Sequence, residues 1–199
     1  MISLKDKKKA WSKLKEDCVN MAAQFYADSA VVFGQGRLDA NIVLIGEAPG
    51  AEEAKMGLPF VGKAGKNLDV FLETLELSRD DIYITNVVKI RPCKKNENTG
   101  RLSNRPPSKD EKAAFMPYLI KELEVIAPKL VVTLGNTALR VFHNITIGEA
   151  HGAAIEAGRF TVFPLYHPAS IIYNRTLEQV YISDLAALKE YIYNSIEIK

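Results

Sequence analysis

Three segments of the sequence contain residue types that could bind a planar ring and assist its release. Phe60 lies in a loop bounded by Gly57 and Gly62, where an aromatic side chain can offer a stacking surface. Asn86 ends an apolar run, and its amide presents a hydrogen-bond donor and an acceptor together. His167, within a His-Pro-Ala-Ser segment, could donate a hydrogen bond to charge that develops on a departing group, as an oxyanion hole does.

Three carboxylates, Glu47, Glu52 and Glu53, lie in the run from Gly46 to Glu53, shortly before the phenylalanine loop. A carboxylate can orient an attacking water molecule and offset positive charge at the reacting carbon. Glu47 is our first candidate for this role and Glu53 is the second. With His167 these two form the predicted catalytic set, and the predicted substrate-binding set is Gly46, Ala48, Phe60 and Asn86.

The same residues follow predicted strands, which should bring them together. Continuous apolar runs predict buried strands at residues 41–46, 81–86 and 129–135, and a hairpin around Gly158 is expected within residues 153–165. Helices are predicted at residues 5–27, 65–76, 109–126 and 177–194, and Pro117 should kink or shorten the third. This alternation predicts an α/β fold, a three-layer α/β/α sandwich with a central, mainly parallel four-stranded sheet. Ligands of such sheets bind at the carboxyl ends of the strands.

Length and composition fit a single domain over residues 1–199. Hydrophobic residues make up 47% and charged residues 25% of the chain, a balance typical of globular proteins and too polar for a membrane-spanning segment. The lysine-rich start lacks the apolar core of a secretory signal, which predicts a cytoplasmic protein. Nothing in the sequence requires a dimer, so we expect a monomer. Cys18 and Cys93 belong to no CxxC pair, which argues against a disulfide framework or a thiolate metal site.

Positive charge is concentrated in one stretch of the chain. Residues 87–112 contain eight basic and three acidic residues, whereas the net charge of the whole chain is only +2. A basic segment on an otherwise acidic body is typical of a polyanion-binding surface, because phosphate binding releases counterions. A solvated loop without a partner is the alternative that charge alone leaves open.

The order of these motifs resembles that of family 4 uracil-DNA glycosylases over about residues 30–190. The segment 46–53 and the glycine-rich segment 57–65 resemble the first motif of that family. Further features follow in the same order: Thr85-Asn86 at a strand end, Arg91-Pro92, the strand 131–135, and His167-Pro168. The resemblance implies the uracil-DNA glycosylase fold and hydrolysis of the glycosidic bond of deoxyuridine in DNA, which releases uracil and leaves an abasic site.

The resemblance also implies a role for each candidate. The Asn86 amide matches the N3–H donor and the O4 acceptor of uracil and mismatches cytosine, in which both are reversed. Phe60 would stack on the extracted base, His167 would donate to O2 of the departing uracil, and Glu47 would orient the water. In the best-known uracil-DNA glycosylases, an aspartate stands at the position of Ala48 and an aromatic residue that blocks thymine stands at the position of Gly50. Family 4 members resemble this chain in lacking both of these residues.

Contacts with DNA are expected from two loops. Ile171 follows the His-Pro motif, where resembling enzymes push an apolar wedge into the gap left by the flipped base. Ile172 is an alternative wedge, and both isoleucines could instead belong to the core. Backbone phosphates would be contacted by Ser170, Lys94, Lys95 and Arg101. A related branch traps its substrate covalently with a histidine near this point, and residues 87–108 contain none, so ordinary turnover is expected.

The cysteines depart from the family pattern. Family 4 members usually hold a four-iron four-sulfur cluster on four cysteines. The chain keeps Cys18 but has Met21, Ile90 and Phe115 at the other three positions, and Cys93 is displaced. One thiolate cannot hold such a cluster, so we expect apolar packing there, and neither cofactor nor metal.

Three other functions stay open. A glycosylase of the same fold could prefer hypoxanthine or a mismatched thymine, because Gly50 leaves room beside the base. A non-catalytic DNA-binding descendant is opposed by the joint presence of Glu47, Phe60, Asn86 and His167. A nucleotide- or sugar-phosphate-binding protein would cradle phosphate with residues 57–65, but that segment lacks GxxxxGKS/T spacing.

Overall fold

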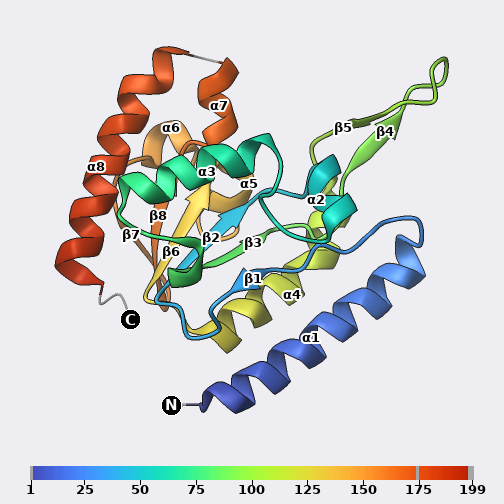
Figure 1. Ribbon diagram of the computed structural model, residues 1–199, viewed down its shortest axis with the longest axis horizontal. Coiled ribbons are helices and arrows are strands. Elements are labelled where there is room, and N and C mark those ends of the chain that lie inside the picture. The colour runs from blue at the N-terminus through green and yellow to red at the C-terminus, as the bar shows by residue number, and fades with distance from the viewer. Residues whose placement is uncertain (1, 174, 197–199) are drawn as a thin grey trace.

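The computed structural model describes residues 2–173 and 175–196, with residues 171–173 and 175 described by their backbone alone. The chain forms a three-layer α/β/α sandwich around a six-stranded sheet with the order β1-β3-β2-β6-β8-β7 (Figure 1). Its strands are β1 (Gln35–Gly36), β2 (Ile42–Gly46), β3 (Tyr83–Asn86), β6 (Leu130–Leu134), β7 (Ile155–Ala157) and β8 (Phe160–Leu165). No helix in the described part of the chain is long and apolar enough to cross a membrane.

Eight α-helices and two short 3-10 turns, η1 and η2, are seen among the described residues. They are α1 (Leu4–Phe25), α2 (Ala51–Met56), α3 (Lys63–Thr74), η1 (Arg79–Asp81), α4 (Lys109–Ile126), α5 (Asn136–Leu139), α6 (Ile147–Ala150), α7 (Pro168–Tyr173), η2 (Arg175–Leu177) and α8 (Glu178–Ser195). The four long helices predicted from the sequence correspond to α1, α3, α4 and α8.

The four inner strands, β3, β2, β6 and β8, run parallel, as predicted. The expected count of four strands is corrected to six, because a short antiparallel strand is added at each edge, β1 beside β3 and β7 beside β8. The β7–β8 hairpin turns at Gly158, where the predicted glycine adopts a φ of +63°. β1 escaped prediction because two exposed residues carry no hydrophobic alternation.

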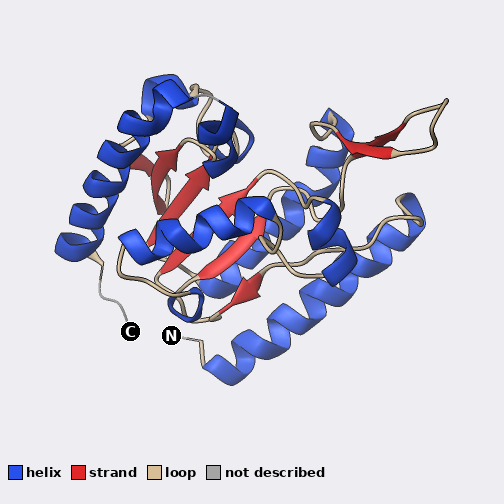
Figure 2. Ribbon diagram, turned by 45° about the horizontal axis from the view of Figure 1, so that its top comes forward, coloured by secondary structure: helices blue, strands red, loops and turns tan. Residues whose placement is uncertain are grey.

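Both faces of the sheet are covered, which explains the continuous apolar runs of its inner strands. Leu44 and Val132 contribute to a core that contains side chains of α3 and α8. Their neighbours Val43 and Val131 point to the opposite face and pack with side chains of α1 and α4. Figure 2 shows the two helical layers on either side of the strands. This arrangement leaves the carboxyl edge of the parallel strands for polar loops.

Helix α4 continues through Pro117 as far as Ile126, so the expectation that this proline shortens the helix is wrong. Ser108 caps the helix start: its hydroxyl accepts the Glu111 N–H at 3.0 Å, and Glu111 accepts the Ser108 N–H at 2.7 Å. Phe115 and other apolar side chains on both sides of the proline are fully buried. Burial of this face therefore outweighs the backbone hydrogen bond that proline removes.

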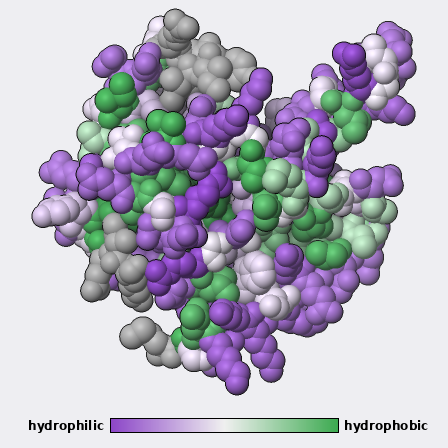
Figure 3. All heavy atoms as spheres, in the orientation of Figure 1, coloured by the Kyte–Doolittle hydropathy of each residue, from purple (hydrophilic) through white to green (hydrophobic). Residues whose placement is uncertain are grey.

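The basic stretch forms a projecting hairpin and not a plain loop. Strands β4 (Cys93–Lys95) and β5 (Leu102–Asn104) pair and extend away from the body of the protein (Figure 1). Figure 3 shows mainly hydrophilic residues over this projection. Its base is fixed by Arg105, which donates to both carboxylate oxygens of Glu111 at 2.7 Å and to the Cys93 carbonyl at 3.2 Å.

The four positions that correspond to the family's cluster cysteines lie in one apolar cluster. Cys18, Ile90 and Phe115 are buried there, and Met21 packs against them. This set offers one thiolate, so it does not fit an iron–sulfur cluster. Among residues 2–173 and 175–196, no group of three or more His, Cys, Asp and Glu side chains is placed to hold a metal ion. The side chains at this position pack α1 and α4 against the strands.

Candidate active site

A cavity of about 1140 Å³ opens at the carboxyl ends of the parallel strands. The loops after β2, β3, β6 and β8 supply most of its wall. Seven of the residues singled out in the sequence line it: Glu47, Ala48, Glu53, Phe60, Asn86, His167 and Ser170. The fold therefore brings together the predicted catalytic residues and the predicted base-binding residues, as the strand order requires.

Gly46, predicted to bind substrate, is not among the residues that line the cavity, but it packs against two that are, Phe60 and Asn86. A Cβ atom at Gly46 would lie 2.4 Å from Asn86 Oδ1 and 2.6 Å from Phe60 Cζ, so a side chain there would displace one of them. Asn86 is 3% exposed, and no described residue forms a hydrogen bond with its side-chain amide. Because Asn86 lines the cavity, the donor and acceptor of its amide are available to a ligand.

Phe60 is held in a strained backbone conformation. Its φ is +53°, in the left-handed region that a bulky side chain rarely adopts. Glu53, buried on α2, holds the loop from one side because its carboxylate accepts the N–H groups of Val61 at 3.1 Å and Gly62 at 2.7 Å. The same carboxylate accepts the Gly50 N–H at 3.1 Å. Three backbone donors thus occupy the Glu53 side chain.

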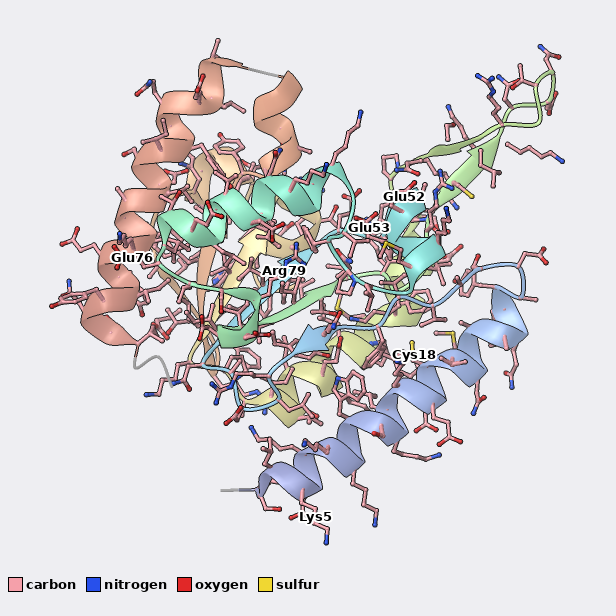
Figure 4. The ribbon with its side chains drawn as sticks, viewed as in Figure 1. Lys5, Cys18, Glu52, Glu53, Glu76 and Arg79 are labelled. Atoms are coloured by element: carbon pink, nitrogen blue, oxygen red, sulfur yellow. The ribbon has the colours of Figure 1, made fainter. Side chains whose placement is uncertain are left out.

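Arg79 holds the same loop from the other side. It donates to the Phe60 carbonyl at 2.7 Å and to Asp69 at 2.7 Å, and Figure 4 shows it reaching from η1 beneath α3. A Cβ atom at Gly65 would lie 1.9 Å from the Phe60 carbonyl oxygen, so glycine is required there. Sequence reasoning missed Arg79, because it lies outside the motifs and only the tertiary structure brings it to the loop.

His167 is placed as a neutral hydrogen-bond donor. Burial lowers the pKa of His167, and the nearby Glu47 carboxylate only partly opposes this effect. The Ala169 N–H donates to Nδ1 of the ring at 3.1 Å, so Nδ1 acts as a hydrogen-bond acceptor. In the neutral ring the proton is then on Nε2. The imidazole lies 6.2 Å from the Phe60 ring, with 22° between the two planes.

Glu47 is partly buried, and the Thr137 hydroxyl of α5 donates to its Oε2 atom. This contact fixes the carboxylate, leaving its other oxygen without a hydrogen bond from any described residue. Thr137 was not predicted as a site residue, because it lies in a four-residue helix without a recognisable motif. Asn136, the first residue of α5, accepts the Ile147 N–H at 2.8 Å and lines the cavity.

Of the predicted DNA contacts, Ser170 lines the cavity, whereas the three basic residues do not. Lys94, Lys95 and Arg101 belong to the hairpin and are exposed. At its base, Asn104 lines the cavity and accepts a hydrogen bond from Arg91 Nε at 2.7 Å. Ile171 belongs to α7 by its backbone, and its side chain lies outside the described residues.

Comparison with known proteins identifies the family. The family model described as the uracil DNA glycosylase superfamily matches residues 33–190, and the chain belongs to this superfamily. Within it, the chain is similar to type-4 uracil-DNA glycosylases. The protein of Thermotoga maritima is 39% identical over 168 residues, which cover 81% of this chain and 83% of the relative.

Two archaeal relatives extend this similarity. The type-4 uracil-DNA glycosylase of Sulfurisphaera tokodaii is 37% identical over 193 residues, covering 89% of this chain and 83% of the relative. That of Archaeoglobus fulgidus is 38% identical over 167 residues, covering 79% of each chain. The resemblance found in the motifs is confirmed by similarity over most of the chain.

Protonation of His167 should destabilise the folded protein. Its pKa is lowered by folding from the ordinary value of about 6.5, so as pH falls the unfolded chain binds the proton first. The free energy of unfolding should therefore decline from about pH 6.5 downward, until the folded-state pKa is passed. Urea unfolding across this range should show the decline in the wild type and a smaller one in His167→Asn. Equal pH dependence in both proteins would contradict the assignment.

Proposed function

We propose that the protein removes uracil from DNA by hydrolysing the glycosidic bond, and that it leaves an abasic site. The observation that carries this proposal is the Asn86 side-chain amide, which has no hydrogen-bond partner among the described residues and lines the same cavity as Phe60 and a neutral His167. A nucleotide must leave the duplex to reach such a cavity, and its base is then read by stacking and edge hydrogen bonds. The similarity to type-4 uracil-DNA glycosylases supports the same conclusion.

Asn86 supplies the selectivity in this proposal. Its amide oxygen accepts the N3–H of uracil and its amide nitrogen donates to O4, whereas cytosine presents an acceptor and a donor in the reverse order. Each buried group left unsatisfied by cytosine costs about 1–3 kcal/mol. Gly46 and Ala48 leave room for the base edge, and Phe60 stacks on its face.

The chemical step needs charge stabilisation on both sides of the breaking bond. As the bond between C1′ and N1 breaks, its electron pair passes to the uracil ring, and His167 Nε2–H donates to the O2 atom on which charge accumulates. A water molecule then attacks C1′ and gives its proton to Glu47, which also faces the positive charge of the sugar. Glu53 accepts three backbone N–H groups, so its role in this proposal is to position the Phe60 loop and not to activate water.

The DNA strand lies across the cavity mouth in this proposal. Lys94, Lys95 and Arg101 of the hairpin contact phosphates on one side, and Ser170 does so beside His167. Ile171, within α7, is the proposed wedge. A monomer is the proposed active form. Residues 1–199 are proposed to act as one domain, in the cytoplasm.

Single-turnover release of the base from matched oligonucleotides tests the proposed activity. Duplexes carry uracil, hypoxanthine or a G:T mismatch, a metal chelator is present, and Asn86→Asp is assayed beside the wild type. We expect chelator-resistant release of uracil, and a loss of about 10- to 100-fold in Asn86→Asp, because an ionised carboxylate cannot donate to O4. Faster release of hypoxanthine or thymine than of uracil would show that the protein prefers another lesion. No release by folded protein from any substrate would favour a DNA-binding descendant.

The hairpin contacts predict a change in salt dependence. Replacing Lys94, Lys95 and Arg101 by alanine should weaken binding to uracil-containing duplex and lower the slope of log K against log salt concentration by about one unit per lost phosphate contact. The control replaces Lys5, Lys8 and Lys9, which are exposed on the first turns of α1, far from the hairpin (Figure 1). Equal slopes for the two triple variants would show that the hairpin makes no specific phosphate contacts.

A further inference from the structure

A fully buried lysine lies directly behind the proposed uracil reader. Lys89 follows Asn86 by three residues, and its side chain is 0% exposed. Its ammonium group donates to the Asn86 backbone carbonyl at 2.8 Å and to Thr85 Oγ1 at 2.6 Å. The third contact is an ion pair with Glu122 of α4, which is also 0% exposed. The three contacts match the three N–H donors of an ammonium group.

Glu122 joins this lysine to the helical layer. Its Oε1 atom accepts from the Tyr83 hydroxyl at 2.6 Å and from the Gly34 N–H at 3.2 Å. Burial and the Glu122 charge raise the pKa of Tyr83, which keeps its hydroxyl protonated as a donor. Trp11 of α1 donates in turn to the Tyr83 hydroxyl at 2.6 Å. The network thus connects α1 and α4 to the end of β3.

A buried ion pair is a weak source of stability, since well-packed apolar residues of similar volume are often as stabilising or more so. Apolar residues would fill the space of Lys89 and Glu122, but they would not bond to the Asn86 carbonyl. Lys89 donates to this carbonyl, and the side chain of Asn86 lines the cavity. Apolar packing therefore could not supply the hydrogen bond that fixes the backbone at Asn86.

We propose that Lys89, held by Glu122, is a positioning residue for uracil recognition. By fixing the Asn86 carbonyl it sets the direction in which the Asn86 amide enters the cavity, and so the ratio of uracil to cytosine accepted. Lys89 contacts no base and acts only through Asn86. The inference rests on the proposed function and extends it to the origin of selectivity.

A double-mutant cycle with Asn86 tests this role. Lys89→Met with Glu122→Gln removes both buried charges together, keeps similar volumes and leaves an acceptor for Tyr83, whereas Lys89→Met alone would strand the Glu122 charge. In this variant, uracil release in single turnover should fall on the order of 10- to 100-fold, as expected for a misplaced recognition group. Affinity for duplex with an abasic site, which has no base to read, should be unchanged.

The decisive comparison is made in the Asn86→Ala background. If Lys89 acts through Asn86, its removal should cause almost no further loss there. A loss as large as in the wild-type background, or wild-type release by the Lys89→Met, Glu122→Gln protein, would overturn the inference. Thr85→Val is the second variant, used with the same readout if the first does not fold, because it removes one lysine contact and introduces no charge. A wild-type protein without uracil release would refute the proposed function itself, and this inference with it.

Discussion

The buried ion pair between Lys89 and Glu122 is the contact on which the geometry of the cavity most depends. It lies where the end of β3 meets the α1 and α4 layer, and it bonds to the backbone of Asn86. Loss of one partner would leave a charge unpaired in the core, which typically costs about 3–5 kcal/mol. The two charged side chains therefore depend on each other, and the backbone of Asn86 is held by the pair. In the proposed function, selectivity thus begins in the core, on the face of the sheet opposite α3 and α8.

The predicted site residues in the cavity wall are also held in place, because each has a backbone or side-chain hydrogen-bond partner that sets its direction. Glu53 and Arg79 hold the strained Phe60 loop from opposite sides, the Ala169 N–H fixes the His167 tautomer, and Thr137 fixes Glu47. Donors placed in advance need not reorganise as charge develops, which is the main source of electrostatic catalysis. In the proposed function, lesion recognition and bond cleavage therefore draw on one cavity. The basic hairpin projects away from the body of the protein, and its proposed role is to contact the DNA strand (Figure 1).

The sequence contains the information for the inner fold and for the residues that face the substrate. Strands buried on both faces give apolar runs that are easily recognised, and their carboxyl ends carry the motif residues Phe60, Asn86 and His167. The supporting residues were not predictable in the same way: Arg79 and Thr137 lie outside the motifs, and Glu122 is 33 positions from Lys89 in the chain. Their pairing is set by tertiary structure. The same limit applies to the two-residue strand β1 and to Pro117, where packing overrides local preference.

A crystal structure of the Glu47→Gln variant bound to a uracil-containing duplex tests the central claim most directly, because slow hydrolysis should keep the base in place. The account predicts a flipped uracil stacked on Phe60, with the Asn86 amide within about 3 Å of N3 and O4, the normal hydrogen-bond distance, and His167 Nε2 equally close to O2. A uracil that stays in the duplex, or one that binds away from Asn86, would contradict it.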